Sequence, residues 1–227
     1  MNWVSENRII LASLALVVIV FGAIILKPKN SDANNIRNSS LDYTQINNSS
    51  HMTKGDQNAK GTVIQYSDFL CPSCSLLSIQ TMPKIEQKYI NTGKVKFEFR
   101  PMAFIAEGSK IAGMGAYCAV DQNKFWEYHD NVYKYSANKI FNEKMDPTKD
   151  VILTNDIVKS IANQSGLNSD NFNYCLDSGK HLSDITSSTE DANKNGIKST
   201  PTVLVNGKTI NGVPSYESID SLLKATL

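Results

Sequence analysis

The chain lacks several features that would assign it to common classes of protein. Its 227 residues carry a formal net charge of only +1 and no basic stripe, so nothing predicts a nucleic-acid partner. No segment recurs with a period of 20–50 residues, which excludes solenoids and propellers. Histidine is rare, and His51, His129 and His181 are scattered along the chain. The length suits one medium domain with appendages.

Long apolar runs are also scarce, and the one that stands out extends from Ile9 to Leu26. About 18 uncharged residues is the lower limit for a helix that crosses a bilayer. We expect an uncleaved transmembrane anchor at residues 9–26, preceded by a short terminus at residues 1–8. The alternative is a cleaved secretory signal, whose core would be shorter and followed by a small-residue cleavage site. Basic residues flank both ends and leave the orientation open.

Residues 27–60 are rich in Asn and Ser and contain few large apolar side chains. Such a segment cannot bury enough surface to offset the entropy lost on ordering. It is predicted to be a disordered linker with a reach of about 30 Å by random-coil scaling.

From residue 61 to residue 227 the pattern predicts a mixed α/β domain. A β-rich segment at Thr62–Ser67 is followed by a helix to about Ile90, and Lys94–Phe99 alternates as a half-buried strand does. An Asn-Gly turn at Asn206-Gly207 predicts a hairpin. Helical tracts fill the intervening and final segments: 108 to about 136, 155–163, 169–176, 183–195, and the C-terminus. The expected order is strand, helix, strand, several helices, hairpin, helix.

Cysteine is scarce too, but two of the four residues are closely spaced, at Cys71 and Cys74 around Pro72 and Ser73. Pro72 suits the first position of a helix, which makes Cys71 the N-cap residue. A thiolate there would accept hydrogen bonds from free N–H groups at the positive end of the helix dipole. We therefore expect Cys71 to have a lowered pKa and to be the exposed, nucleophilic sulfur, and Cys74 to be shielded.

Two other interpretations of the pair are open. A zinc site would usually need a second such pair or nearby histidines, and Cys118, Cys175 and the histidines are isolated. A purely structural disulfide is the other alternative. The redox interpretation is favoured over both.

The stretch "GIKSTPTVLVNG", Gly196 to Gly207, places Pro201 at the entry of a strand. Proline cannot occupy a central ladder position, so a turn is expected there. A cis Thr200-Pro201 bond would expose backbone groups beside the strand.

The chain resembles the DsbA-type branch of the thioredoxin superfamily in its membrane-anchored bacterial form. The resemblance rests on "YSDFLCPSC", "EFRPMAF", "CAVDQNKFWEYHDNVY", "YCLDSGK" and "GIKSTPTVLVNG", which follow in this order over about 170 residues. It implies a thioredoxin fold with an inserted α-helical subdomain at about residues 108–180. It also implies that Cys71 is the attacking cysteine, that Cys74 resolves the mixed disulfide, and that Thr200-Pro201 is a cis-proline loop that binds substrate backbone.

Two supporting positions near the cysteines are interpreted in the same way. Ser73 stands where well-known relatives carry His, which implies a milder oxidant, since a serine offers only a hydrogen bond to the thiolate. Asp68 matches an acid of relatives and is expected either to cap the turn or to move protons, with capping favoured.

Cys118 and Cys175 lie on apolar faces of expected helices. The residues alone suggest two small buried side chains, whereas the resemblance implies a structural disulfide between them. The aromatic residues Phe125, Trp126, Tyr128 and Tyr133 are expected in the core, and His129 is expected to be a core histidine with its hydrogen bonds satisfied.

These observations predict an extracytoplasmic thiol:disulfide oxidoreductase, an enzyme that introduces disulfides into secreted or surface proteins. Its expected substrates are folding proteins with free thiols, and its expected reoxidant is a membrane quinone-linked protein. No metal and no cofactor beyond the Cys71–Cys74 disulfide is expected. The polar linker favours a monomer. We expect this monomer in the cell membrane with its domain outside, because a reducing cytosol would keep the couple reduced. The alternatives are a reductase or isomerase of the same fold and a non-enzymatic metal-binding surface module.

Overall fold

The structure, a computed structural model, describes residues 36–37, 52–211 and 213–227. The predicted terminus at residues 1–8, the anchor at 9–26 and most of the linker lie outside these residues. Within the described ranges, no helix is both long and apolar enough to cross a bilayer.

A six-stranded mixed sheet organises the domain, with strand order β1-β6-β5-β3-β4-β2. The central strands β3 (Gly61–Ser67) and β4 (Val95–Pro101) run parallel, and β5 (Thr202–Val205) pairs antiparallel with β3. β6 (Lys208–Asn211) follows β5 through a turn. This turn has positive φ at Asn206 and Gly207, +48° and +80°, which confirms the Asn-Gly hairpin.

A helix with two wide turns connects β3 to β4. It comprises α3 (Pro72–Leu76), the i→i+5 turn η2 (Leu77–Thr81), α4 (Met82–Ile85) and the i→i+5 turn η3 (Glu86–Ile90). Pro83 lacks the N–H that a regular turn would use. The wide turn directly before α4 accommodates it without ending the helix.

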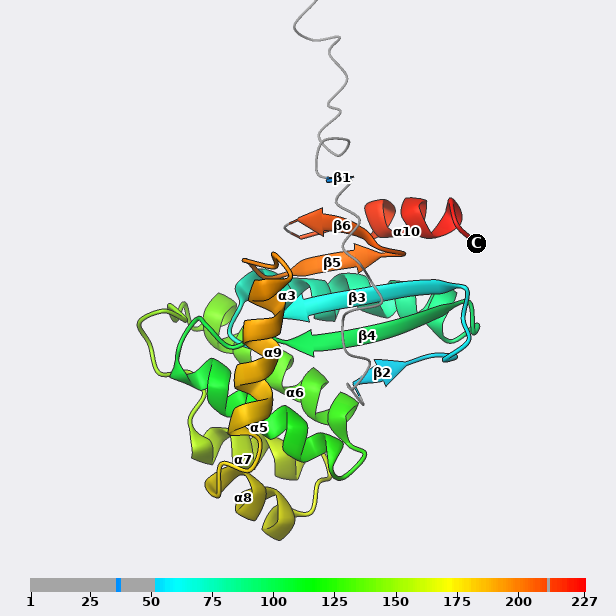
Figure 1. Ribbon diagram of the computed structural model, residues 1–227. Coiled ribbons are helices and arrows are strands. Elements are labelled where there is room, and N and C mark those ends of the chain that lie inside the picture. The colour runs from blue at the N-terminus through cyan, green and yellow to red at the C-terminus, as the bar shows by residue number, and fades with distance from the viewer. Residues whose placement is uncertain (1–35, 38–51, 212) are drawn as a thin grey trace, which may run out of the picture. The chain divides into compact units, whose positions relative to one another are not determined.

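Four α-helices and the short π-helical segment η4 (Asn138–Asn142) lie between β4 and the last helix before the hairpin, and Figure 1 shows the four α-helices gathered on the β4 side of the sheet. They are α5 (Glu107–Val120), α6 (Phe125–Ala137), α7 (Asn155–Gln164) and α8 (Ser169–Asp177). The tract predicted to run from 108 to about 136 is thus two helices. The chain reverses at Asn123, whose φ of +55° is a left-handed conformation that asparagine tolerates.

The two faces of the sheet bury different cores. Figure 1 shows α9 (Leu182–Lys194) across one face and α3 behind the other. The α9 face holds a small cluster: Ile64, Tyr66, Met102, Ala192, Ile197 and Leu204. Alternate residues of the same strands, Val63, Val203 and Val205, join the main core on the opposite face, as the period of two requires. There they share a cluster with Ile219 and Leu223 of α10 (Tyr216–Lys224) and with the inserted helices.

Two strands lie within residues 27–60, so the prediction of a disordered linker is wrong at residues 36–37 and 53–54. Thr53–Lys54 form β2 against β4, and Met52 is fully buried. The Trp126 indole N–H donates to the Thr53 carbonyl at 3.2 Å. A short strand β1 (Ile36–Arg37) also pairs with β6. Both strands depend on partners distant in sequence, which the local composition could not reveal.

Candidate active site

The Cys71–Cys74 pair lies where β3 ends and α3 begins. Cys71 is the N-cap of α3 with an extended backbone (φ −73°, ψ 118°), and Pro72 occupies the first turn. The Cys71 Sγ accepts the backbone N–H of Cys74 at 3.2 Å. Both cysteines are free thiols. The local geometry is therefore that of a capped helix N-terminus whose capping atom is a sulfur.

Cys71 is only 4% exposed, so the expectation of an exposed sulfur is wrong. The cover comes from the loop before β5, because the Cys71 thiol donates to the Thr200 carbonyl at 3.4 Å. The Thr200-Pro201 peptide bond is cis. Antiparallel pairing of Tyr66 with Thr202 brings this loop to the end of β3.

The two thiols differ sharply in electrostatic environment. Hydrogen bonds from the Cys74 thiol, from the Thr200 side chain and from the Cys74 N–H lower the pKa of Cys71, although burial and the nearby Asp68 charge oppose this. Burial raises the pKa of Cys74 well above its usual value, and its hydrogen bond to Cys71 adds to the effect. Cys74 is 0% exposed. One sulfur is thus poised as a thiolate and the other as a thiol.

Asp68 is fully buried beneath the loop that carries Cys71. Its Oδ1 accepts the Leu70 N–H at 2.8 Å, and its Oδ2 accepts the N–H groups of Phe104 (3.0 Å) and Ile105 (3.3 Å). Burial raises the pKa of this carboxyl. The carboxylate ties the loop after β3 to the loop after β4. Ser73, half-buried at the second position of α3, makes no side-chain hydrogen bond within the described residues.

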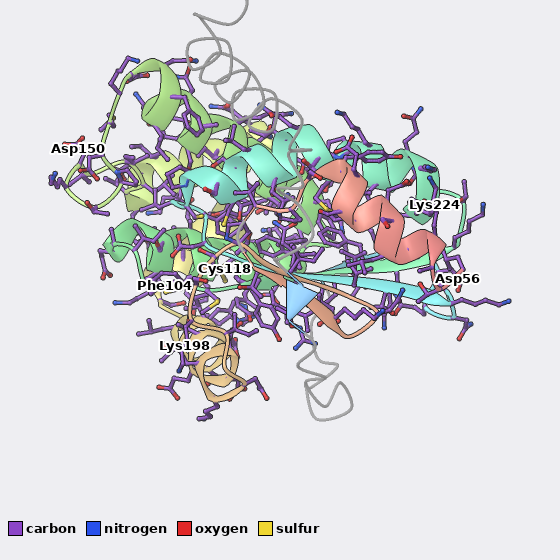
Figure 2. All side chains as sticks on the ribbon, turned by 90° about the horizontal axis from the view of Figure 1, so that it is seen from above. Asp56, Phe104, Cys118, Asp150, Lys198 and Lys224 are labelled. Carbon is purple, nitrogen blue, oxygen red and sulfur yellow. A yellow bond between two sulfur atoms is a disulfide. The ribbon has the colours of Figure 1, made fainter. Side chains whose placement is uncertain are left out.

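The other two cysteines are joined by a disulfide. Cys118 of α5 and Cys175 of α8 have Cα atoms 6.0 Å apart and are separated by 57 residues (Cys118 is labelled in Figure 2). With His181 they form the one close group of candidate metal ligands in the described part of the chain. The disulfide occupies both sulfurs, so neither can serve as a thiolate ligand.

Several polar residues around Cys74 were not anticipated from the sequence. Ser67 works against the rise in the pKa of Cys74, and the Tyr133 hydroxyl donates to the Asp68 carbonyl at 3.4 Å. Gln65 donates from Nε2 to Ser67 at 2.8 Å and to Ser78 at 3.2 Å. All of them except Ser78 are fully buried. Strand alternation indicated that Gln65 and Ser67 share a face, but only the fold brings Tyr133 to them.

His129 also differs from expectation. Its Nδ1 lies 2.8 Å from the Asp130 carboxylate, while its buried Nε2 has no hydrogen-bond partner in the described structure. The expectation of a satisfied core histidine is wrong for this atom. The surrounding aromatic residues are core, as predicted: Phe125, Tyr128 and Tyr133 are buried, and Trp126 packs against them.

The sequence profile of the thioredoxin family matches residues 47–225. Among characterised sequences, the chain is 27% identical to "Disulfide bond formation protein D" of Bacillus subtilis over 178 residues, 76% of this chain and 75% of that protein. It is also 27% identical to "Probable disulfide bond formation protein D" of Bacillus anthracis over 229 residues, 98% of each chain.

Solved structures agree with these matches. The crystal structure of oxidised BdbD from Bacillus subtilis superposes with a TM-score of 0.67 at 25% identity, covering 77% of this chain and 91% of that one. DsbA of Chlamydia trachomatis superposes with a TM-score of 0.66 at 18% identity, covering 77% and 90%, a likeness of fold.

Proposed function

The chain belongs to the thioredoxin family, in its DsbA-type branch, and from this membership we propose that it is a dithiol oxidase acting on proteins outside the cytoplasm. The observation that carries the proposal is the position of Cys71. Its sulfur caps α3, accepts the Cys74 N–H and faces the cis Thr200-Pro201 loop. This arrangement supplies a stabilised leaving thiolate, which thiol–disulfide exchange requires.

The proposed cycle starts from the Cys71–Cys74 disulfide. A substrate thiolate attacks the Cys71 Sγ, the bond between the two protein sulfurs breaks, and Cys74 leaves and takes up a proton. The second substrate thiol loses its proton and attacks the sulfur bonded to Cys71. Cys71 then leaves as the thiolate that its environment stabilises. The substrate has lost two electrons to the Cys71–Cys74 couple, and this transfer requires no other redox group.

The lowered pKa of Cys71 supports the oxidising direction. Stabilising the thiolate stabilises the reduced protein and therefore raises the reduction potential. Each pKa unit corresponds to about 1.4 kcal/mol, or about 30 mV for a two-electron couple. Burial and the Asp68 charge work against the shift, and Ser73 adds no charge, so we infer an oxidant of moderate strength.

Apolar surface beside the couple supports folding proteins as substrates. Phe104, labelled in Figure 2, is 50% exposed on the loop that Asp68 holds against the cysteine loop. A cavity of about 550 Å³ is lined by Leu70, Ile111 and Val151, and Val151 is 75% exposed. Unfolded segments offer side chains that such surfaces bind, while the Thr200-Pro201 loop would pair with their backbone.

We further infer that the protein is a monomer anchored by residues 9–26, with residues 1–8 inside the cell and the domain outside. Outside, a quinone-linked membrane protein would reoxidise the couple, whereas a reducing cytosol would keep it reduced. The similarity to proteins named for disulfide bond formation supports this location.

Refolding of reduced ribonuclease tests the proposal. The oxidised protein should restore ribonuclease activity in stoichiometric amounts, and catalytically when a small-molecule oxidant is added. A reduction potential near the thioredoxin value of about −270 mV would identify a reductase instead. Absence of any ribonuclease reactivation would leave a non-enzymatic module of the same fold as the better interpretation.

A further inference from the structure

The Cys118–Cys175 disulfide lies among polar groups of the kinds that bind metal ions. His181, the N-cap residue of α9, places a ring nitrogen within 4.8 Å of both sulfurs. The Asp121 Oδ2 is 3.9 Å from the Cys175 Sγ and 2.8 Å from the His181 Nε2. Thiolate, imidazole and carboxylate are the three kinds of side-chain ligand that zinc takes. Reduction of one disulfide would therefore assemble a complete set of four zinc ligands.

The spacing of these atoms suits a tetrahedral ion. Zinc bonds of about 2.0–2.3 Å place neighbouring ligand atoms about 3.4–3.8 Å apart. The distances from the Asp121 Oδ2 to Cys175 and His181, 3.9 and 2.8 Å, lie on either side of that range. The sulfurs separate when their bond is broken, while the packing of α5 against α8 keeps the two cysteines together.

The His181 ring is held as a metal-binding imidazole usually is. Its Nδ1 contacts the Asp184 carboxylate at 2.5 Å, and its ring stacks on Tyr117 with 5.6 Å between the centroids. A histidine that binds a metal generally donates its other ring N–H to a carboxylate, which fixes the tautomer and the ring orientation. With the hydrogen on Nδ1, the Nε2 beside Asp121 has the lone pair that a metal needs.

The charges and the exposure of the cluster are also compatible with a bound cation. Two thiolates and the Asp121 carboxylate carry three negative charges, of which a zinc ion would balance two. The Lys180 Nζ lies 2.8 Å from the Asp121 Oδ2 and supplies the third positive charge. The side chains of Asp121 and His181 are 36% and 13% exposed, so this edge of the cluster is open to ions from solvent.

We propose that the reduced Cys118–Cys175 pair binds Zn²⁺ together with His181 and Asp121, and that oxidation of the pair releases the ion. No reductant is needed to form the site, because the chain is synthesised with free thiols in a reducing cytosol. On binding, each thiol loses one proton to solvent and forms a zinc–sulfur bond. When a disulfide oxidises the pair, its S–S bond breaks and the Cys118–Cys175 bond forms. Two electrons pass to the oxidant, which leaves as two thiolates, and Zn²⁺ dissociates.

The consequence concerns the protein before its structural disulfide exists. A metal bound by residues of α5, α8 and the start of α9 would close the same 57-residue loop that the disulfide later closes. Because the unfolded chain does not hold these ligands together, zinc binding would favour the folded state of the reduced protein. The site does not depend on the proposed oxidase activity.

The test uses full-length Cys71→Ser/Cys74→Ser protein, so that the active-site thiols cannot bind metal. The protein is reduced with a phosphine, freed of metal and titrated with Co²⁺. We expect one Co²⁺ per chain, with a thiolate-to-cobalt charge-transfer band and the strong visible bands of tetrahedral coordination. Zn²⁺ should remove both by displacing Co²⁺. The same protein with its disulfide intact should show neither band. Oxidised glutathione added to the zinc-loaded protein should release one Zn²⁺ for each disulfide formed, as measured with a zinc-sensitive dye.

Variants in the same background identify the ligands. Asp184→Asn should weaken zinc binding by about 10–100-fold, the usual effect of losing the carboxylate behind a metal-binding histidine. His181→Gln and Asp121→Asn should weaken it at least as much. His129→Gln is the matched control, because it makes the same change at a histidine that pairs with Asp130 outside the cluster, and it should leave zinc binding unchanged.

A stability measurement separates metal binding from packing. Zn²⁺ should raise the urea midpoint of the reduced protein and leave that of the oxidised protein unchanged, and His181→Gln should abolish the rise. A folded, reduced protein without thiolate-to-cobalt bands would refute the site. Full zinc affinity in His181→Gln would show that the cysteines bind metal without the assigned partners, and would also overturn it. Reduced protein that stayed unfolded in excess Zn²⁺, by circular dichroism, would do the same. Failure to reactivate ribonuclease would count against the oxidase alone.

Discussion

Removing the Cys118–Cys175 disulfide should destabilise the protein by an amount that follows from its place in the chain. The bond closes a loop of 57 residues between α5 and α8. In the chain-entropy treatment, a loop of this length lowers the entropy of the unfolded state by about 14 cal/mol/K, or about 4 kcal/mol at 25 °C. Both cysteines are buried, but replacement by alanine removes only a sulfur atom from each site.

The double variant Cys118→Ala/Cys175→Ala should therefore unfold at lower urea concentration, with a free energy of unfolding reduced by about 4 kcal/mol. In a thermal scan the midpoint should fall by about 8–16 °C for a domain of this size. Oxidase activity at 25 °C should be retained, because the change lies in the inserted helices and leaves Cys71 and Cys74 in place.

The wild-type protein in dithiothreitol provides the matched control. Reduction opens the same loop without changing the sequence, so wild type and variant should then unfold at nearly the same urea concentration. A loss below 1 kcal/mol under oxidising conditions would refute the entropic reasoning. A difference that persisted undiminished in reductant would assign the loss to packing instead.

Three further predictions concern the couple and its location. Cys71→Ser should abolish disulfide transfer, whereas Cys74→Ser should accumulate mixed disulfides with substrate, visible on non-reducing gels; absence of these adducts would reverse the assigned roles. Alkylation of the reduced protein should modify Cys71 with a midpoint below the usual cysteine pKa of about 8.5, because its folded pKa is lowered, and Cys74 only far above it; equal reactivity would contradict the N-cap argument. Protease added to intact protoplasts should degrade the domain, and full protection until lysis would place it in the cytosol.

The architecture followed closely from local patterns. The alternation in Lys94–Phe99 corresponds to β4, and the Asn206-Gly207 turn to the β5–β6 hairpin. Pro72 after a strand was enough to place Cys71 at a helix N-cap, because capping is decided by a few consecutive residues. These features depend on short-range sterics and hydrogen bonding, which the sequence states directly.

The sequence alone determined that a capped cysteine precedes a second cysteine one turn later in the domain, and hence the class of chemistry. Only the tertiary structure decided how that chemistry is enclosed. The carbonyl that covers Cys71 comes from a residue 129 positions away, and the amides that bind Asp68 come from 36 and 37 positions away. The hydrogen bond from the Tyr133 hydroxyl to the Asp68 carbonyl forms because α6 packs against α3. Such contacts arise where distant segments bury their surfaces together, and no local pattern of residues encodes which segments will meet.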